Sequence, residues 1–339
     1  MAVGHFMMAF EALFFLALLT LILGNGAFKP NISTQVGGLY ASGDPRRDRA
    51  YSIFYVGVNL GAFLAPLVCG TLGEVVGWHY GFGAAGVGML IGLATYLCAG
   101  RTLLPDERTR AHSEPRAREP LDRTEWRSLV ALLVLCLPLS LFWATYEQQG
   151  NTIALWADDF TDRSVNLILW SGEIPTTWFQ AVNPLLIFAF TPPIVGLWAW
   201  QAKRKSEPST GTKMTLGCLG VAVAYLIMAL AAFSLEGGGK ASWLWLLAYF
   251  AVLTVGELYV SPTGLSLVSK VAPAQALSLT MGLWLGTSFL GNLMSGWLGS
   301  FWDSMGKALF FLMVALIAAL ASVGTWVCSQ PLKAIHKDV

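Results

Sequence analysis

Long apolar stretches, each bounded by polar or charged residues, recur along the whole of this 339-residue chain. A stretch of about 20 apolar residues spans the ~30 Å hydrocarbon core of a bilayer as an α-helix. The pattern therefore predicts nine membrane helices. The first lacks the basic leader and cleavage site that are typical of a signal peptide. The nine stretches are residues 6–28 (or 6–40, if the helix does not stop at Lys29), 51–73, 80–104, 128–150, 176–201, 212–234, 242–266, 275–300 and 308–328.

The composition agrees with this pattern. Hydrophobic residues make up 55% of the chain and charged residues only 12%, whereas a soluble domain carries about 25% charged residues. So few charges cannot cover the surface of a soluble globular protein. The net charge of +1 and the lack of a basic motif give no reason to expect a nucleic-acid partner. We expect the five cysteines, which lie in apolar stretches without a close pair, to form neither disulfides nor a metal site; they are Cys69, Cys98, Cys136, Cys218 and Cys328.

The basic residues indicate an orientation, because cytoplasmic loops collect Lys and Arg. Of the 21 Lys and Arg residues, seventeen lie around 41–50, 101–127 and 202–213, at Lys270, and in the C-terminal tail. The alternate loops hold only Arg163, Lys240 and Lys307. This split predicts a cytoplasmic C-terminus. With nine helices the N-terminus would then lie outside, which suggests that three helices precede residue 1 in the complete protein.

A charged, proline-containing segment divides the chain. We predict that residues 105–127 form a cytoplasmic linker, because basic and acidic residues alternate there with prolines. Residues 1–104 would then form a partial bundle of three helices, and residues 128–330 a bundle of six. Residues 331–339 would form a cytoplasmic tail.

Three charged residues fall inside apolar stretches, where a charge is costly and therefore often functional. Glu147 could be a functional charge inside the membrane, or it could mark the point where the helix emerges at the outer interface. Glu257 could likewise bind a ligand, or it could cap a helix broken at Ser261–Pro262. Lys29 could mark the inner end of the first helix and snorkel to the headgroups, but eleven mostly apolar or small residues follow it. A desolvated lysine has a lowered pKa, which suits proton exchange with a carboxylate.

Uncharged polar and aromatic residues extend this set. Asn59 lies between two glycines that would allow close helix packing, so it is either an interhelical hydrogen-bonding residue or a substrate contact. Asn183 precedes a proline, where freed backbone carbonyls can line a site. Trp143 lies four residues before Glu147, on the same helix face, and Trp284 and Ser288 are also four apart. A tryptophan in a membrane helix more often packs or anchors at the interface than contacts a substrate.

Five segments together resemble the signatures of one family. They are FKPNISTQVGGLY, DPRRDRAYSIFYVGVNLGAFLAPLVCG, FWATYEQQG, WFQAVNPL and GELYVSPTGLSLVSKVAP, in that order. They resemble the proton-dependent oligopeptide transporter family, a branch of the major facilitator superfamily, over essentially the whole chain. The resemblance implies an all-α polytopic membrane protein with the family's helices 4–6 and a complete C-terminal bundle. It also implies proton-coupled symport of di- and tripeptides.

The resemblance assigns roles to the residues singled out above. Lys29 and Glu147 would couple transport to protons, and Asn59, Asn183 and Glu257 would hold the peptide, with Glu257 near its amino end. Trp143 and Trp284 would wall side-chain pockets, and Ser288 would add a polar contact. The family needs no cofactor beyond the proton as coupling ion. The complete protein would be a monomer in the bilayer, and compact outer loops favour a bacterial inner membrane.

One departure from the family leaves alternatives open. The E-x-x-E-R motif of the family's first helix does not occur in this sequence, and the first three helices would be absent. The chain could therefore be a relative that carries another small solute, such as nitrate or an amino-acid derivative, or an inactive membrane fragment. The linker is too short for two additional helices, so the parent resembles the twelve-helix type. No H-E-x-x-H or G-x-S-x-G motif occurs, and we do not expect an enzyme.

Overall fold

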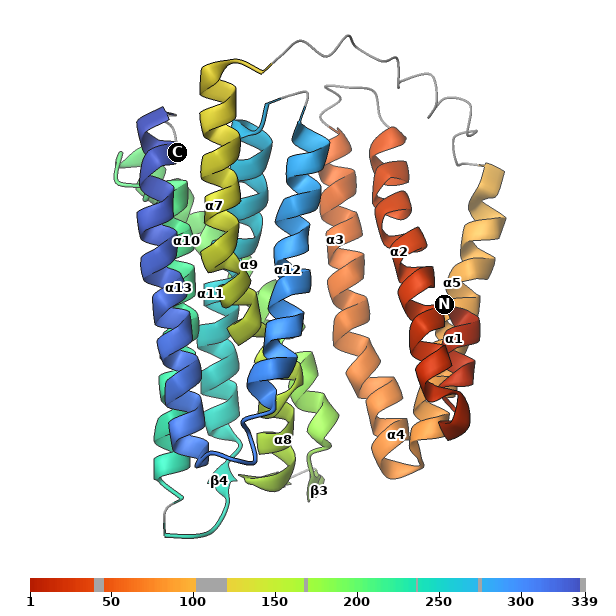
Figure 1. Cartoon of the computed structure of the whole chain (residues 1–339). Coiled ribbons are helices and arrows are strands. Elements are labelled where there is room, and N and C mark those ends of the chain that lie inside the picture. Colours follow the sequence, from red (N-terminus) through yellow and green to blue (C-terminus); the bar gives the residue numbers. More distant parts are fainter. Residues whose placement is uncertain (40–45, 102–120, 168–169, 236, 274–275, 336–339) are drawn as a thin grey trace. The chain divides into compact units, whose positions relative to one another are not determined.

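The computed structural model describes residues 1–39, 46–101, 121–167, 170–235, 237–273 and 276–335 (Figure 1). The chain forms two compact units, Met1–Ala117 and Arg118–Val339. The boundary between them falls within the segment that was predicted to be a linker. Each unit is described by itself below.

Unit 1 (Met1–Ala117) consists of helices. The helical segment after α1 begins with a 3₁₀ turn, and α3 continues through a π-helical turn into α4. Gly77 joins α4 to α5 with a φ of 149°, a conformation that glycine adopts without steric cost. The elements are α1 (Ala2–Met7), the 3₁₀ turn η1 (Glu11–Leu13), α2 (Phe14–Gly38), α3 (Arg46–Ala65), the π turn η2 (Pro66–Gly70), α4 (Thr71–Val75), α5 (Trp78–Cys98) and the 3₁₀ turn η3 (Ala99–Arg101).

The first membrane helix differs from its simplest prediction. Instead of starting at Phe6, the apolar segment is divided into the short α1 and the long α2, and α2 continues past Lys29 to Gly38. The longer of the two predicted extents is therefore correct at its C-terminal end. The short α1 packs back on α5, where Gly86 leaves room for the Phe6 ring.

The helices of unit 1 bury little of themselves. In their candidate membrane-spanning segments only 6–11% of the residues are buried. At Gly57 and Gly61 no atom lies within 4 Å of the position that a Cβ would take. Within the described residues of unit 1 these two glycines therefore make no close helix contact, and the prediction that they allow close packing stays a prediction.

Unit 2 (Arg118–Val339) contains the six helices predicted for residues 128–330, with short elements at one end. Two of these elements are small sheets that the apolar pattern did not predict. The elements are α7 (Arg123–Tyr146), the 3₁₀ turn η4 (Glu147–Gly150), α8 (Thr152–Asp159), β1 (Thr161–Asp162), β2 (Ser164–Leu167), β3 (Trp170–Glu173), the 3₁₀ turn η5 (Thr176–Trp178), α9 (Phe179–Lys203), α10 (Thr210–Phe233), β4 (Ala241–Ser242), α11 (Leu244–Val271), α12 (Leu277–Gly299) and α13 (Lys307–Ile335).

Each of the nine predicted stretches coincides with a long helical segment. Among the described residues, eight of these segments are long and apolar enough to cross a membrane. The ninth is α12, which has 23 residues but also Asn292 and several glycines that lower its mean hydropathy. The molecule is thus an all-α polytopic membrane protein.

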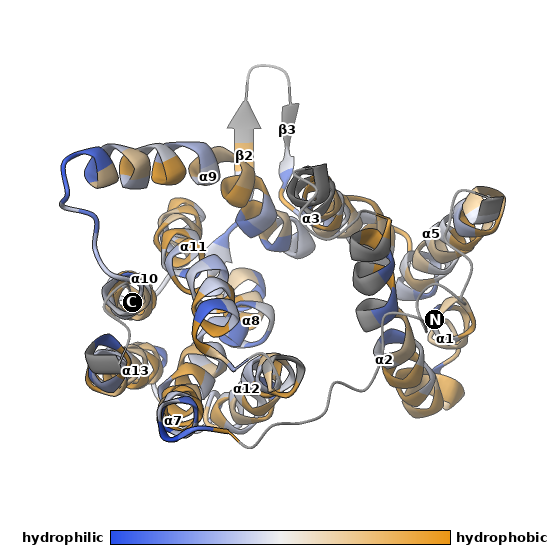
Figure 2. Ribbon diagram, turned by 90° about the horizontal axis from the view of Figure 1, so that it is seen from above, coloured by the Kyte–Doolittle hydropathy of each residue, from blue (hydrophilic) through white to orange (hydrophobic). Residues whose placement is uncertain are grey.

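The core of unit 2 lies around α10, which packs against α11 and α13, while α7 packs against α12 and α13. Figure 2 shows α9 at the edge of this unit, next to α11. Large aromatic side chains fill the interior, and Phe142, Tyr225, Tyr249 and Phe311 are fully buried. Because lipid tails are as apolar as these side chains, the bundle is stabilised mainly by close van der Waals packing and by hydrogen bonds between helices.

Two of the helix contacts depend on glycine. A Cβ at Gly217 of α10 would stand 2.6 Å from the carbonyl oxygen of Gly256 in α11, and a Cβ at Gly256 would stand 2.7 Å from that of Gly217. At a second crossing, Gly291 of α12 faces the Cβ of Trp143 in α7. Small residues let helix backbones approach closely in this way, and both crossings fix helices that carry candidate site residues.

The end of unit 2 that carries α8 is closed by strands. β1 pairs with β4 in parallel, and β2 pairs with β3 in an antiparallel hairpin. Arg163 holds this end together, because its guanidinium forms ion pairs with Asp158 (3.3 Å) and Glu173 (3.0 Å) and donates to Thr176 Oγ1 (2.7 Å). The neighbouring Asp162 accepts hydrogen bonds from the hydroxyl and the backbone amide of Ser164, which hold the pKa of its carboxyl below its usual range.

Candidate functional site

Glu257 lies midway along α11 of unit 2, as the fourteenth of its 28 residues. Asn183 of α9 is buried and donates from Nδ2 to Glu257 Oε2 at 3.0 Å and to Thr254 Oγ1 at 3.1 Å. Thr254 lies one turn before Glu257 and donates in turn to the Phe250 carbonyl at 2.7 Å. Two predicted site residues from different helices thus meet directly.

The end of α7 supplies the next residues. The Tyr146 hydroxyl and the Glu147 carboxylate both lie close enough to Glu257 to interact with it, and the two carboxylates repel each other. Trp143 stacks edge-on against Tyr146, with ring centroids 5.4 Å apart. Trp143, Glu147, Asn183 and Glu257 are therefore brought together around Tyr146.

Three long-range hydrogen bonds fix the chain on both sides of Glu147. The Tyr225 hydroxyl of α10 donates to the Thr145 carbonyl at 2.7 Å. The buried Gln148 side chain donates to the Ser295 carbonyl of α12 at 2.8 Å, and the Gln180 side chain of α9 donates to the Gln149 carbonyl at 2.8 Å. The turn that carries Glu147 is thereby tied to three helices.

Two alternative readings of the carboxylates can now be judged. Helix α11 continues through Pro262 to Val271, so the reading of Glu257 as the cap of a helix broken at Ser261–Pro262 is wrong. Glu147 lies level with the middle of α11, because its neighbour Tyr146 contacts Glu257. This level favours a position inside the bundle over one at the outer interface.

Trp284 and Ser288 lie further along the bundle, on α12. Trp284 is buried and lies against Gly264 of α11, where a Cβ would stand 2.1 Å from the indole. Ser288 donates to the Leu285 carbonyl within its own helix at 2.8 Å. The structure gives Trp284 a packing contact between α11 and α12, and it places neither residue in direct contact with Glu257.

Lys29 and Asn59 belong to unit 1. Lys29 lies inside α2, but its side chain is outside the described residues. Asn59 is buried and donates from Nδ2 to the Tyr55 carbonyl, one turn earlier in α3, at 2.9 Å. Within unit 1 this is a bond to its own helix, and no interhelical bond of Asn59 is present among the described residues.

Sequence reasoning missed Tyr146, Thr254 and Tyr225. Tyr146 directly precedes Glu147, and Thr254 lies three residues before Glu257 on the same helix face, so their spacing to the carboxylates was the available signal. Tyr225 has no such neighbour in sequence, and only the packing of α10 against α7 reveals it.

The chemistry of this cluster suits the binding of a cation. Within the described residues Glu257 forms no ion pair, and both its hydrogen-bond partner Asn183 and the nearby Tyr146 are neutral. A partly buried carboxylate held by neutral donors keeps its capacity to attract an ammonium group. The described residues hold no group of three His, Cys, Asp or Glu side chains that could bind a metal ion.

Long apolar helices around a central cluster of carboxylates and amides are the features of an integral membrane transporter, and comparison with known proteins identifies the family. The sequence model of the POT family matches residues 1–111 and 112–311. The chain belongs to this family, whose members have the major facilitator fold.

Individual relatives agree with this assignment. The chain is 32% identical to the peptide transporter YePEPT of Yersinia enterocolitica subsp. palearctica serotype O:3, over 88% of this chain and 71% of that protein. It is 30% identical to the di-/tripeptide transporter of Lactococcus lactis subsp. cremoris, over 96% of this chain and 76% of that protein. A crystal structure of a peptide transporter POT in complex with sulfate is similar with a TM-score of 0.85 at 28% identity, over 99% of this chain and 78% of that one.

Proposed function

We propose that this chain carries out proton-coupled symport of di- and tripeptides, as a secondary active transporter and not as an enzyme. The observation that carries this proposal is the contact of Asn183 and Tyr146 with Glu257 at the middle of a family member's six-helix bundle. The names of the relatives, which are peptide and di-/tripeptide transporters, support the substrate class.

The charges at the two ends of a peptide indicate how this chain would bind it. A zwitterionic peptide needs an anion near its amino group and a cation near its carboxylate, so Glu257 would receive the ammonium group and Lys29 the carboxylate. Asn183 and Asn59 would hold the peptide backbone. Trp143 and Trp284 would wall the side-chain space, and Ser288 would add a polar contact; for Trp284 the packing against α11 limits this role to an exposed edge of the ring.

Coupling would depend on Lys29 and Glu147. A carboxylate in a low-dielectric site binds a proton more readily when no cation stands beside it, so changes in the distance between these two groups would load and release a proton. The proton would be the coupling ion, with no further cofactor. We place the protein in the inner membrane of a bacterium, with a cytoplasmic C-terminus, and expect a monomer in the complete form.

Uptake of a labelled dipeptide into proteoliposomes tests this function. We expect the chain to accumulate the dipeptide when the proton gradient is directed inward and only to equilibrate it without a gradient. Glu147→Gln should abolish accumulation but still allow exchange of labelled for unlabelled peptide. Lys29→Ala should abolish accumulation and also slow exchange, because it removes the group that would receive the peptide carboxylate. Empty liposomes and the Asp303→Asn variant, whose side chain is 98% exposed, serve as controls.

Other outcomes would point to other functions. Gradient-driven uptake of nitrate or of an amino-acid derivative, with none of dipeptides, would contradict the proposed substrate class. Dipeptide accumulation that persists in Lys29→Ala and Glu147→Gln would contradict the coupling roles. The absence of any uptake, restored by adding the first three helices of a relative, would indicate that these 339 residues are inactive by themselves.

A further inference from the structure

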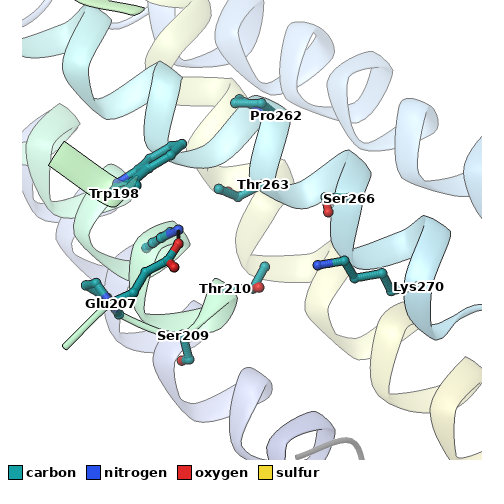
Figure 3. A pocket seen from close by; sticks show the side chains of 10 residues that line it. Trp198, Glu207, Ser209, Thr210, Pro262, Thr263, Ser266 and Lys270 are labelled. Atoms are coloured by element: carbon teal, nitrogen blue, oxygen red, sulfur yellow. Dashed lines mark hydrogen bonds and ion pairs between the residues drawn. The ribbon is translucent and has the colours of Figure 1, made fainter. Parts of the chain in front are cut away.

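A pocket separate from the Glu257 cluster opens at the other end of α9. It has a volume of about 540 Å³ and lies between the C-terminal part of α9, the start of α10 and the C-terminal part of α11 (Figure 3). Basic and hydroxyl side chains dominate its wall. The lining residues that matter here are Trp198, Glu207, Thr210, Lys213, Ser266 and Lys270.

One of the two lysines in this wall is already neutralised. Lys213 is buried, forms an ion pair with Glu207, and lies over the Trp198 ring with its Nζ 4.2 Å from the centroid. Lys270 is different, because it is exposed and forms no ion pair within the described part of the chain. The pocket therefore has an excess of one positive charge.

Hydrogen-bond donors surround this unpaired charge. Figure 3 shows the Lys270 side chain extending from α11 toward Thr210 and Ser266. Neither hydroxyl has a hydrogen-bond partner among the described residues, and the buried indole Nε1 of Trp198 also lacks one. Thr210 is the first residue of α10. Ser209 caps this helix by accepting from the Thr212 N–H, so the Thr210 and Gly211 N–H groups and the helix dipole remain to favour an anion. Charge and donors together fit a phosphate group.

The surroundings of the pocket identify the kind of phosphate. Trp198 and Trp200 lie near the end of α9, and Lys203 and Arg204 follow directly, with Arg204 stacked on Trp200 at 4.0 Å. Aromatic residues followed by basic ones are typical of a cytoplasmic membrane interface, and Leu197 and Trp200 are exposed on the outside of α9. Basic pockets between membrane helices at this level bind anionic headgroups.

We propose that this pocket binds the phosphate of an anionic phospholipid headgroup. Lys270 provides the charge, Thr210, Ser266 and the start of α10 provide the hydrogen bonds, and the acyl chains lie along the exposed side of α9. The lipid bridges the ends of α9, α10 and α11. This site is separate from the cluster around Glu257, because the two share no residue.

Binding of a fluorescent phosphatidylglycerol to the purified full chain in detergent tests the proposal. We expect Lys270→Gln to weaken binding about fivefold, the effect of roughly 1 kcal/mol per basic residue near anionic lipid. Lys270→Arg should retain binding. Lys203→Gln removes the same charge at the end of α9 but outside the pocket, so it should change the affinity less than about twofold.

Two further probes separate the source of the phosphate. A fluorescent phosphatidylcholine should bind much more weakly than phosphatidylglycerol. Inorganic phosphate should not displace the lipid at equal concentration, because it lacks acyl chains. Equal affinities of Lys270→Gln and Lys203→Gln, or equal binding of both lipids, would overturn the proposal. Displacement by inorganic phosphate at equal concentration would also overturn it, in favour of a site for free phosphate.

Discussion

At the scale of single residues, the negative charge of Glu257 is the feature on which the proposed binding of the peptide amino terminus depends. Replacement by Gln keeps the shape and the hydrogen bond with Asn183 but removes the negative charge. Because a hydrogen bond to a charged group contributes ~1.5–3 kcal/mol, we expect dipeptides with a free amino terminus to bind Glu257→Gln about tenfold or more weakly. Competition with labelled dipeptide uptake measures this.

An N-acetylated dipeptide provides the control, since it has no ammonium group for Glu257 to attract. Its affinity should change little in Glu257→Gln, and Asp303→Asn should leave both affinities unchanged. An equal loss for the free and the acetylated peptide would show that Glu257 does not receive the amino terminus.

Tyr225 has a structural role that its apolar surroundings hide. Its buried hydroxyl donates to the Thr145 carbonyl and also bonds to the Tyr249 hydroxyl at 2.8 Å. Tyr225→Phe leaves both groups short of a partner inside the core, so we expect a loss of about 1–3 kcal/mol in the free energy of unfolding and a lower melting temperature in detergent. Tyr80→Phe, at a residue that is 54% exposed, should melt like the unchanged chain; equal melting of Tyr225→Phe would contradict the role.

The sequence revealed part of this cluster and concealed the rest for a physical reason. Asn183 and Glu257 stand out because amides and carboxylates are rare in apolar helices. Tyr146, Thr254 and Tyr225 do not, because tyrosine and threonine are common in membrane helices and their hydroxyls usually bond locally. Which hydroxyl reaches another helix depends on packing, which periodicity does not encode.

At the scale of helices, the crossing of α10 and α11 at Gly217 and Gly256 sets the position of Glu257. Gly217→Ala would place a methyl group 2.6 Å from the Gly256 carbonyl oxygen, so the helices must separate. We expect a loss of about 1–3 kcal/mol in stability together with weaker peptide binding, measured by thermal unfolding and by uptake competition.

Gly282→Ala is the matched control, because no atom lies within 4 Å of its added methyl group in α12. Alanine is the better helix former, so this variant should be as stable as the unchanged chain or more so. A Gly217→Ala variant with unchanged melting and peptide affinity would show that the crossing tolerates a wider spacing.

Helix positions were predictable, and helix ends were not. Hydropathy indicated a helix over 128–150, but α7 begins at Arg123, where Asp122 and Glu125 form a capping box. Such polar first turns lie outside the apolar run and are fixed by caps. The paired strands at the other end of the bundle escaped prediction because two to four residues carry too short an alternation to be recognised.

At the scale of the whole molecule, the two units differ in how much they bury. In unit 2 between 22% and 56% of each candidate spanning segment is buried, against 6–11% in unit 1. Since membrane helices are held together by close packing and interhelical hydrogen bonds, unit 2 has a packed core of its own. The helices of unit 1 depend more on what surrounds them, whether lipid or other protein.

The distribution of basic residues predicts how the chain is oriented in the membrane. Seventeen of the 21 Lys and Arg residues lie in the loops that we place in the cytoplasm, so the segment between α9 and α10 should face inward and the segment between α10 and α11 outward. In a chain whose five native cysteines are replaced by alanine, Lys240→Cys should react with a membrane-impermeant maleimide in intact cells. Ser206→Cys should react only after permeabilisation. The reverse pattern would place the lipid-binding pocket on the outer face, and it would also reverse the direction assigned to proton-coupled uptake.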